Sequence, residues 1–503
     1  MKDQAGSSDF LGRAGPLVLA RFATALLGIS IPLVLARMLP LEDYGTYKQL
    51  FLLSQTLYFV LPLGVPQGLF YFLPRVEERR SYLFQSLLFM AGMGCLSAVL
   101  LHGALPWLSG VLNNPALLEH RLALSVYTGA LLGSFGLEPS LTARGRTGAA
   151  AIAYLISDTT RALLLVLPVL FGFGLAGMMG SLAAYALLRW GLAWWVGLSG
   201  ERGPFWVPTH ATAQLRYALP FGAAMALAIP QQYAHQYAVS WAVSPEAFAI
   251  YAVGCFQLPL VDLLYTPTSE VLMVRLGELD AQGRSHEGVG AFREASGKLA
   301  YVFLPMAAFL FAAAPDFIGG LFGARYLDAV PIFRVSVLAV CLALLPMDGV
   351  LRARGRTRAI FFSYLTKAVV TVPLVYVGVT RFGMMGAVSA WALAELVGKC
   401  TLLAAVPGAL GLKGVRGVLR MLPLQELARA GGAAMAAAVS VWLLRSGVPG
   451  RLTDLHDGWV RLLPLAVAGV LFLMGYALLL RLSGVNPMEV VAAFRPRRAQ
   501  RAS

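Results

Sequence analysis

Charged side chains are scarce in this sequence. Asp, Glu, Lys and Arg make up 13% of its 503 residues, and hydrophobic residues make up 58%. A soluble globular chain is about a quarter charged, because its surface must face water. The composition therefore excludes a soluble protein and predicts a chain that lies in a lipid bilayer.

Cysteines and catalytic motifs are also scarce. The four cysteines lie far apart inside apolar segments, with no CxxC pair, so neither disulfides nor a zinc site is expected. No nucleophile–base pair or metal-ligand cluster stands out. Short segments of alternating polarity, which mark membrane β-barrels, are missing too. We expect an all-α integral membrane protein that is not an enzyme and holds no cofactor.

Long apolar runs account for most of the chain. A helix that crosses a bilayer needs about 20 apolar residues, and the sequence offers about fourteen such runs, with polar residues before the first. That first run is long and lacks a small-residue cleavage site, so we expect a retained helix. The expected spans lie near 14–36, 46–73, 82–107, 118–142, 149–171, 176–198, 214–241, 246–273, 298–322, 331–351, 359–380, 384–406, 427–446 and 459–482.

The net charge of +15 is distributed unevenly between the loops. Loops near 110–117, 172–175 and 242–245 hold no Lys or Arg. Cytoplasmic loops carry the excess of basic residues, so both termini are expected in the cytoplasm. This placement explains the charge without nucleic acid as a partner. The basic segments are 75–80, 144–146, 275–293, 352–358, 413–420 and 495–501.

The chain repeats itself at a distance of about 205 to 210 residues. Residues 143–147 read ARGRT, and so do residues 353–357; the GMMG of 177–180 returns at 383–386. Self-similarity on this scale indicates a duplicated bundle, which is a common architecture of transporters. Because six spans separate the copies, the two repeats should insert in parallel.

The repeat gives a domain plan with two six-helix lobes and two additional C-terminal helices. Lys413, Arg416 and Arg420 fall on one helical face, as in a helix that lies at the membrane surface. Prolines on the matching spans one, two, seven and eight predict helix breaks there. The plan comprises an N-terminal lobe (1–198), a linker (199–213), a C-terminal lobe (214–406), a cytoplasmic interfacial helix (407–426), spans thirteen and fourteen (427–483) and a basic cytoplasmic tail (484–503).

Residues 35–47, LARMLPLEDYGTY, and residues 61–68, LPLGVPQG, resemble the start of polysaccharide-exporting flippases. The turn at 144–147 after span four is similar to theirs as well. The resemblance is to the Wzx-type O-antigen and exopolysaccharide flippases of the MOP superfamily, which also includes MATE drug exporters and lipid II flippases. It implies two lobes around a V-shaped cavity, lined mainly by spans one, two, seven and eight.

The resemblance also implies the substrate, an undecaprenyl-pyrophosphate-linked oligosaccharide that crosses from the cytoplasmic to the periplasmic leaflet for surface polysaccharide or lipopolysaccharide biosynthesis. Its partners would be this lipid, membrane lipids and polysaccharide polymerase machinery. The alternative on the same fold is a MATE-type multidrug or cation antiporter. A membrane glycosyltransferase, polymerase or ligase would carry a large periplasmic loop, and the outer loops here are short.

Ionisable residues at membrane depth are the first candidates for a substrate site. Arg21 in span one and Lys48 in span two, near Gln55, could meet a pyrophosphate, or could snorkel to an interface. Lys367 in span eleven has no local partner in sequence. Two other groups, Asp158 with Arg161 and Glu395 with Lys399, are spaced as pairs within one helix.

Span seven carries an unusual polar stretch. Gln232, His235 and Gln236 could bind sugar hydroxyls, or could hydrogen-bond neighbouring helices. Gln257 in span eight is a further candidate for the substrate.

Two carboxylates of span eight, Asp262 and Glu270, are candidates for coupling transport to a proton or sodium gradient. Asp262 could instead neutralise Arg21. Spans thirteen and fourteen, outside the repeat, either line a track for the lipid tail or stabilise the bundle.

Overall fold

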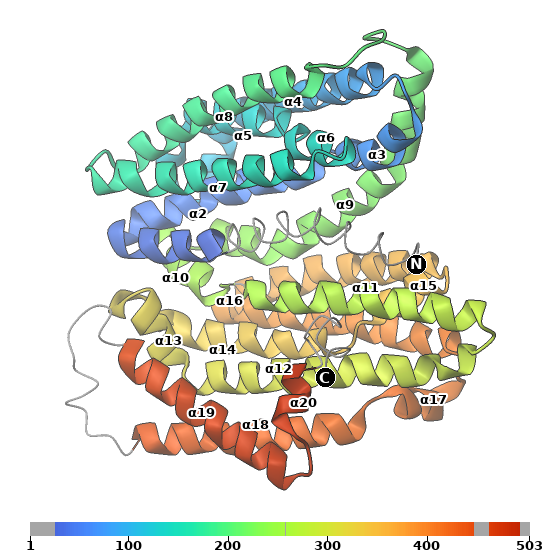
Figure 1. Ribbon diagram of the computed structural model, residues 1–503. Helices are drawn as coiled ribbons and strands as arrows, with labels where there is room; N and C mark the ends of the chain where they lie inside the picture. Colours follow the sequence, from blue (N-terminus) through green and yellow to red (C-terminus); the bar gives the residue numbers. More distant parts are fainter. Residues whose placement is uncertain (1–25, 257, 447–461, 493–503) are drawn as a thin grey trace. The chain divides into compact units, whose positions relative to one another are not determined.

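The computed structural model describes residues 26–256, 258–446 and 462–492, and every regular element within these ranges is a helix (Figure 1). The all-α fold is thus confirmed. Within these ranges seven helices are long and apolar enough to cross a membrane, or eight if one bent pair counts as a span. The number fourteen stays a prediction. The chain divides into two compact units, Met1–Ala249 and Ile250–Ser503.

The first unit is a bundle in which small residues allow helices to approach closely. Gly94 of α4 and Gly129 of α5 face each other, and a Cβ on Gly94 would lie 2.4 Å from the Gly129 carbonyl oxygen. Small residues at such crossings are how helices pack in membranes. After an apolar helix at Leu26–Met38, the unit contains α2 (Leu41–Val60), α3 (Val65–Phe72), α4 (Arg80–Val111), α5 (Arg121–Gly133), α6 (Leu137–Ala143), α7 (Thr147–Leu170), α8 (Gly174–Leu198) and α9 (Pro208–Ala242).

Span two is broken between α2 and α3, as its prolines predicted. Leu63 and Gly64 have φ angles of 46° and 77°, a left-handed conformation that ends a helix. The break lies against Gly222 of α9, where a Cβ would come within 2.5 Å of the Leu63 carbonyl oxygen. Only glycine lets α9 pass the break at this distance.

A buried hydrogen-bond network joins the other end of α2 to α9. Gln49 donates to Ser240 Oγ at 2.8 Å and to the Leu112 carbonyl at 3.1 Å. Asn114 donates to Thr46 Oγ1 at 2.8 Å and to Gln49 Oε1 at 2.6 Å. Helix α9 therefore belongs to the first unit by its contacts with α2, α3 and α4. The predicted lobe boundary at 199–213 stays a prediction.

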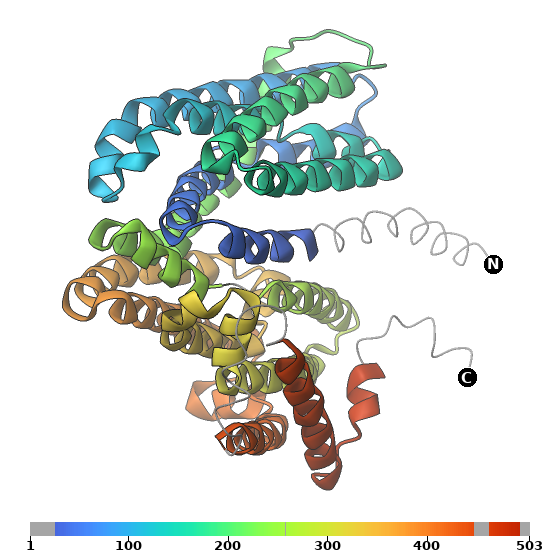
Figure 2. The same ribbon diagram turned by 90° about the vertical axis from the view of Figure 1, so that its left-hand side faces the viewer.

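The second unit packs its helices around α12. Helix α18 lies along α12 and α19 lies beside α18 (Figures 1 and 2). After α10 (Pro245–Gly254), where the units meet in sequence, the elements are α11 (Pro259–Ala281), α12 (Gly288–Ala312), α13 (Ala314–Leu321), α14 (Val330–Leu338), α15 (Met347–Ala353), α16 (Thr357–Ala409), α17 (Gly414–Met421), α18 (Leu424–Ser446), α19 (Leu462–Leu482) and α20 (Pro487–Ala492).

Helix α16 contains two of the expected spans. It is interrupted at Gly383, with φ 60° and ψ −144°. On either side of this break Gly378 and Gly386 approach each other, and a Cβ on Gly378 would lie 2.5 Å from the Gly386 carbonyl oxygen. The interruption falls between the spans expected at 359–380 and 384–406.

Not every predicted proline break is present. Helix α10 and helix α11 are bent by 44° at their junction, next to Pro259, as expected for span eight. Helix α9, however, continues through Pro220 and Pro230, and α11 continues through Pro267. A proline removes one helix hydrogen bond but keeps a helical φ, so a packed apolar helix can continue through it.

Helix α17 occupies the segment expected at the membrane surface. Its apolar residues Val415 and Leu419 are 77% and 52% exposed, and Arg416 and Arg420 are exposed as well. A short helix on which both apolar and basic side chains are exposed is typical of a helix that contacts lipid headgroups.

Candidate substrate-binding site

A buried ion pair forms the centre of the first unit's polar interior. Glu138 lies in the first turn of α6, after the interruption that separates α5 from α6. Its carboxylate pairs with Arg189 of α8 at 2.8 Å, and the side chains are 4% and 10% exposed. Arg189 also donates to Ser134 Oγ at 3.0 Å. Because both charges have partners, the pair can exist inside an apolar bundle.

A second ion pair lies on α7. Arg161 and Asp158 are 3.5 Å apart on the same helix, which confirms the pair predicted from their spacing. The Arg161 side chain is 38% exposed. Tyr127 of α5 and Tyr58 of α2 lie close to it. This guanidinium therefore has one carboxylate partner and remains accessible.

Lys48 adds a third cation to this interior. It is half-buried on α2, with its ammonium nitrogen 5.3 Å and 5.6 Å from the ring centroids of Tyr44 and Tyr47. The described residues supply no carboxylate within ion-pair distance of it. Aromatic rings stabilise a cation while leaving it free to bind an anion.

A series of aromatic rings leads from Lys48 toward Arg161. Tyr47 and Phe51 are 4.6 Å apart, and Phe51 and Tyr127 are 5.9 Å apart, between ring centroids. We call the five charged residues of this interior cluster 1: Lys48, Glu138, Asp158, Arg161 and Arg189. This set contains three cations and two carboxylates, so its formal charge is +1.

The polar stretch of α9 packs on α2 in the same unit. His235 is buried, and Gln232 and Gln236 are half-buried. Tyr237 shares a hydrogen bond of 2.7 Å with Thr56 of α2. Gln231, which the sequence analysis did not select, is buried, and the described residues leave its Oε1 without a hydrogen-bond donor. Part of this stretch thus joins helices, while amide groups remain for a ligand.

The second unit has a matching polar centre around Asp348, in the first turn of α15. The carboxylate accepts hydrogen bonds from Tyr265 and from Ser269, the latter at 3.3 Å, and pairs with Arg352. Lys399 lies with its ammonium 5.3 Å from the Tyr265 ring centroid.

Lys367 and Glu395 form an ion pair between the two halves of α16. We call the five charged residues of this second interior cluster 2: Asp348, Arg352, Lys367, Glu395 and Lys399. Three cations again face two carboxylates.

One expectation about these pairs is wrong, namely that Glu395 would pair with Lys399 in its own helix. Lys367 has no partner nearby in the sequence, as expected, and its partner comes from 28 positions away. Instead the chain folds back at Gly383, so Lys367 meets Glu395 across the two halves of α16. Gly398 allows this approach, since a Cβ there would lie 3.3 Å from the Lys367 side chain.

Glu138 and Asp348 are equivalent under the repeat, and the sequence analysis missed both. They are 210 residues apart, as are Arg144 and Arg354, and each precedes its repeated arginine by six residues. A carboxylate in an apolar span at a fixed distance from the repeated turn was a signal that could have identified them.

The repeated arginines stabilise the loops that carry them. Arg144 pairs with Glu201 at 3.2 Å, donates to the Val196 carbonyl at 3.0 Å and is 1% exposed. Burial lowers the pKa of Arg144 below its ordinary value, and Glu201 opposes this shift. Arg354 pairs with Asp280 in the second unit. Since Arg144 and Arg354 already have acidic partners, their role is structural.

The remaining predicted site residues are not brought into these clusters. Gln55, Asp262 and Glu270 are exposed on α2 and α11. Arg21 and Gln257 lie outside the described residues. Binding and coupling roles for all the selected residues stay predictions.

Comparison with known proteins identifies relatives of this fold. Residues 34–331 match a family profile described as polysaccharide biosynthesis protein. None of the curated proteins compared with the chain matches it. The chain is similar in structure to the lipid II flippase MurJ in an inward closed conformation, with a TM-score of 0.67 and 13% identity over 92% of this chain and 98% of that one.

It is also similar to an inward-facing multidrug resistance MATE family transporter of the MOP superfamily. There the TM-score is 0.63 and the identity 14%, over 78% of this chain and 96% of that one. A MOP superfamily transporter from Pyrococcus furiosus matches with a TM-score of 0.54 and 12% identity, over 82% of this chain and 95% of that one. At these identities the likeness establishes the fold.

Proposed function

Because the chain belongs to the family of polysaccharide biosynthesis proteins, we propose that it is a flippase for a polyprenyl-pyrophosphate-linked oligosaccharide. The family and the MOP-type fold confirm the resemblance noted at residues 35–68. They support a membrane transporter of this superfamily. The undecaprenyl carrier, the bacterial inner membrane and the supply of surface polysaccharide are parts of the proposal.

The observation that carries the proposal is the excess of cations in both polar interiors. Cluster 1 and cluster 2 each hold three cations and two carboxylates. A pyrophosphate carries concentrated negative charge and binds guanidinium and ammonium groups by charge-assisted hydrogen bonds. Cationic drugs, the substrates of the alternative MATE-type antiporter, would be repelled by the same excess.

The polar stretch of α9 supports recognition of a glycan. Amide side chains both donate and accept, which matches sugar hydroxyls, and tyrosine rings cover the apolar faces of sugars. Gln232, Gln236 and Tyr233 are each half-buried on this helix. In this proposal they contact the oligosaccharide while Lys48 contacts the pyrophosphate.

An apolar groove of the second unit supports a place for the polyprenyl tail. It has a volume of about 530 Å³ and lies between α12, α14 and α18. Ala434, Met435 and Ala438 of span thirteen line it, with Phe311 opposite. A tail much longer than a phospholipid chain needs such an apolar track. Coupling through Asp262 and Glu270 to protons or sodium completes the proposed cycle.

Transport of a fluorescent undecaprenyl-pyrophosphate oligosaccharide in proteoliposomes tests the function. We expect Lys48→Ala to slow it about tenfold or more, since a hydrogen bond to a charged group contributes about 1.5–3 kcal/mol. Lys413→Ala, which removes a cation outside the interior, is the matched control and should transport normally. Export of a cationic dye with no glycan transport would favour the drug antiporter instead.

A further inference from the structure

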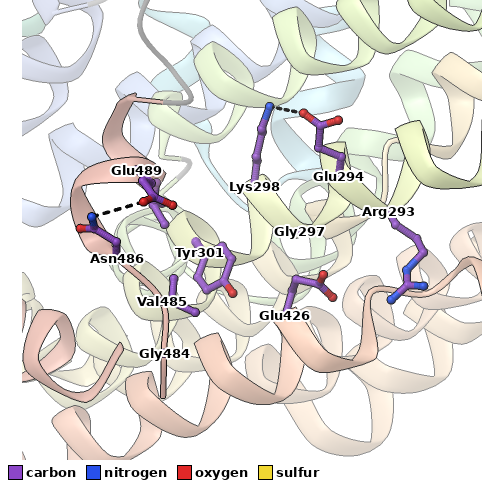
Figure 3. Close-up of a pocket in the computed structure, with 11 residues that line it drawn as sticks. Arg293, Glu294, Gly297, Lys298, Tyr301, Glu426, Gly484, Val485, Asn486 and Glu489 are labelled. Carbon is purple, nitrogen blue, oxygen red and sulfur yellow. Dashed lines mark hydrogen bonds and ion pairs between the residues drawn. The ribbon is translucent and has the colours of Figure 1, made fainter. Parts of the chain in front are cut away.

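A polar pocket lies at one end of the second unit, away from cluster 2. It has a volume of about 340 Å³. Helix α12, the start of α18 and the turn between α19 and α20 supply its walls (Figure 3). The basic residues of 275–293 predict that this end of α12 faces the cytoplasm. The pocket is thus at the depth where lipid headgroups lie.

The pocket borders a second, apolar groove. This groove lies between α12 and α19, has a volume of about 540 Å³ and shares Tyr301 and Val490 with the pocket. Tyr476 of α19 donates to the Tyr301 carbonyl at 3.0 Å and holds the two helices at this spacing. A polar pocket beside an apolar groove matches the two parts of a phospholipid, its headgroup and its acyl chains.

The charges of the pocket select the headgroup. Lys298 is already paired with Glu294 at 2.7 Å, which leaves Arg293 as the cation of the lining without a carboxylate partner among the described residues. Two further carboxylates, Glu426 and Glu489, also line the pocket. The Oε2 atom of Glu426 is buried and accepts no hydrogen bond from the described residues.

These groups require a ligand with both a donor and an acceptor. Asn486 donates one amide hydrogen to Glu489 at 3.4 Å. A primary amine can donate to Glu426 and Glu489, and a phosphate can accept from Arg293 and from the second amide hydrogen of Asn486. A pyrophosphate would meet more carboxylates than cations in this lining, so the transported lipid is a poor fit. A quaternary ammonium has no hydrogen to donate, and a glycerol headgroup has no positive charge.

We propose that this joined pocket and groove bind a phospholipid with an ethanolamine-phosphate headgroup, which is a resident lipid and not the transported substrate. One acyl chain lies along Phe309, Phe472 and Leu473 in the groove. The amine lies between Glu426 and Glu489, which Figure 3 draws on either side of Tyr301. The lipid then joins α19 and α20 to α12. This proposal stands even if the transported substrate is different.

Native mass spectrometry of the full chain in detergent tests it, with phosphatidylethanolamine, phosphatidylglycerol and phosphatidylcholine of equal acyl chains added in turn. We expect phosphatidylethanolamine to be retained most strongly. Glu426→Gln and Glu489→Gln should each weaken that retention about tenfold, the effect of losing a hydrogen bond between charged groups. Glu278→Gln, an exposed residue of α11 outside the pocket, is the matched control.

Equal retention of the three lipids, or retention unchanged in both variants, would overturn the proposal. Displacement of phosphatidylethanolamine by added undecaprenyl pyrophosphate would overturn it too, because the groove would then belong to the carrier. Size-exclusion chromatography of each variant shows whether it has folded. If the Glu426→Gln variant does not fold, the Glu489→Gln variant tests the proposal, because Glu489 is exposed.

Discussion

At the scale of single residues, Arg189 and Glu138 show how a bundle tolerates internal charge. Each is buried, and each depends on the other for its main partner. Arg189→Gln would leave the Glu138 carboxylate buried and unpaired, so we expect the free energy of unfolding to fall by about 3–5 kcal/mol. An SDS titration of the purified protein, followed by tryptophan fluorescence, measures this loss.

The double variant Glu138→Leu/Arg189→Met distinguishes two contributions to the free energy of unfolding. One is the destabilisation caused by an unpaired buried charge, and the other is the stabilisation that the ion pair itself provides. It removes both charges and keeps apolar volume, so its unfolding free energy should return close to that of the unchanged protein. A double variant as unstable as the single one would show that the pair itself, and not the unpaired charge, determines stability.

Pairing within one helix could be predicted from the sequence, and pairing between helices could not. Asp158 and Arg161 are three residues apart, a spacing that places them on one face, and the structure confirms their pair. The partner of Lys367 is 28 positions away and meets it only because the chain reverses at Gly383. Spacing along a sequence carries no information about such a reversal.

At the scale of elements, the break in span two depends on its neighbour. Gly222→Ala would place a Cβ 2.5 Å from the Leu63 carbonyl oxygen. Either the backbone of α9 or the backbone at Leu63 would have to move to relieve this contact. We expect lower unfolding free energy and slower glycan transport in this variant. Both are measured as for the unchanged protein, by SDS titration and in proteoliposomes.

Gly180→Ala on α8 is the control for this element. Nothing lies within 4 Å of its added Cβ, and alanine in an open helix position is favoured over glycine by roughly 0.5–1 kcal/mol. Equal loss of stability in both variants would mean that glycine itself, and not the close approach at Leu63, is what matters.

Helix breaks were predictable where proline and glycine act together. Residues 61–68 contain two prolines and two glycines, and α2 ends there. Pro220 and Pro230 of α9 stand in a long apolar run, and the helix continues through them. A proline alone therefore marks a weak point, and the packing of neighbouring helices decides whether the chain bends there.

At the scale of the whole molecule, the repeat organises each unit in the same way. A carboxylate six residues before the repeated turn, Glu138 or Asp348, is the centre of each polar interior. Their partners differ. Glu138 pairs with an arginine of α8, whereas Asp348 accepts a hydrogen bond from Tyr265 and pairs with Arg352. The duplicated scaffold preserves the position of the charge, while the surrounding side chains differ, as the proposed asymmetric lipid-linked substrate would require.

The same repeat makes a prediction about orientation. Thr147 and Thr357 follow the two copies of the repeated turn, and six spans separate them in the expected plan, so both should lie in the cytoplasm.

To test this orientation, single cysteines are introduced at Thr147 and Thr357 after the four native cysteines are replaced. A membrane-impermeant maleimide added to intact cells should leave both unlabelled and should label them once the membrane is opened. Glu119→Cys, on an exposed position just before α5 and next to the loop at 110–117 that is expected outside, should be labelled in intact cells and shows that the reagent works. Labelling of both threonine positions from outside would reverse the orientation but keep the parallel repeat. Labelling of only one would mean an odd number of spans between the copies, and the two units could then not be parallel repeats.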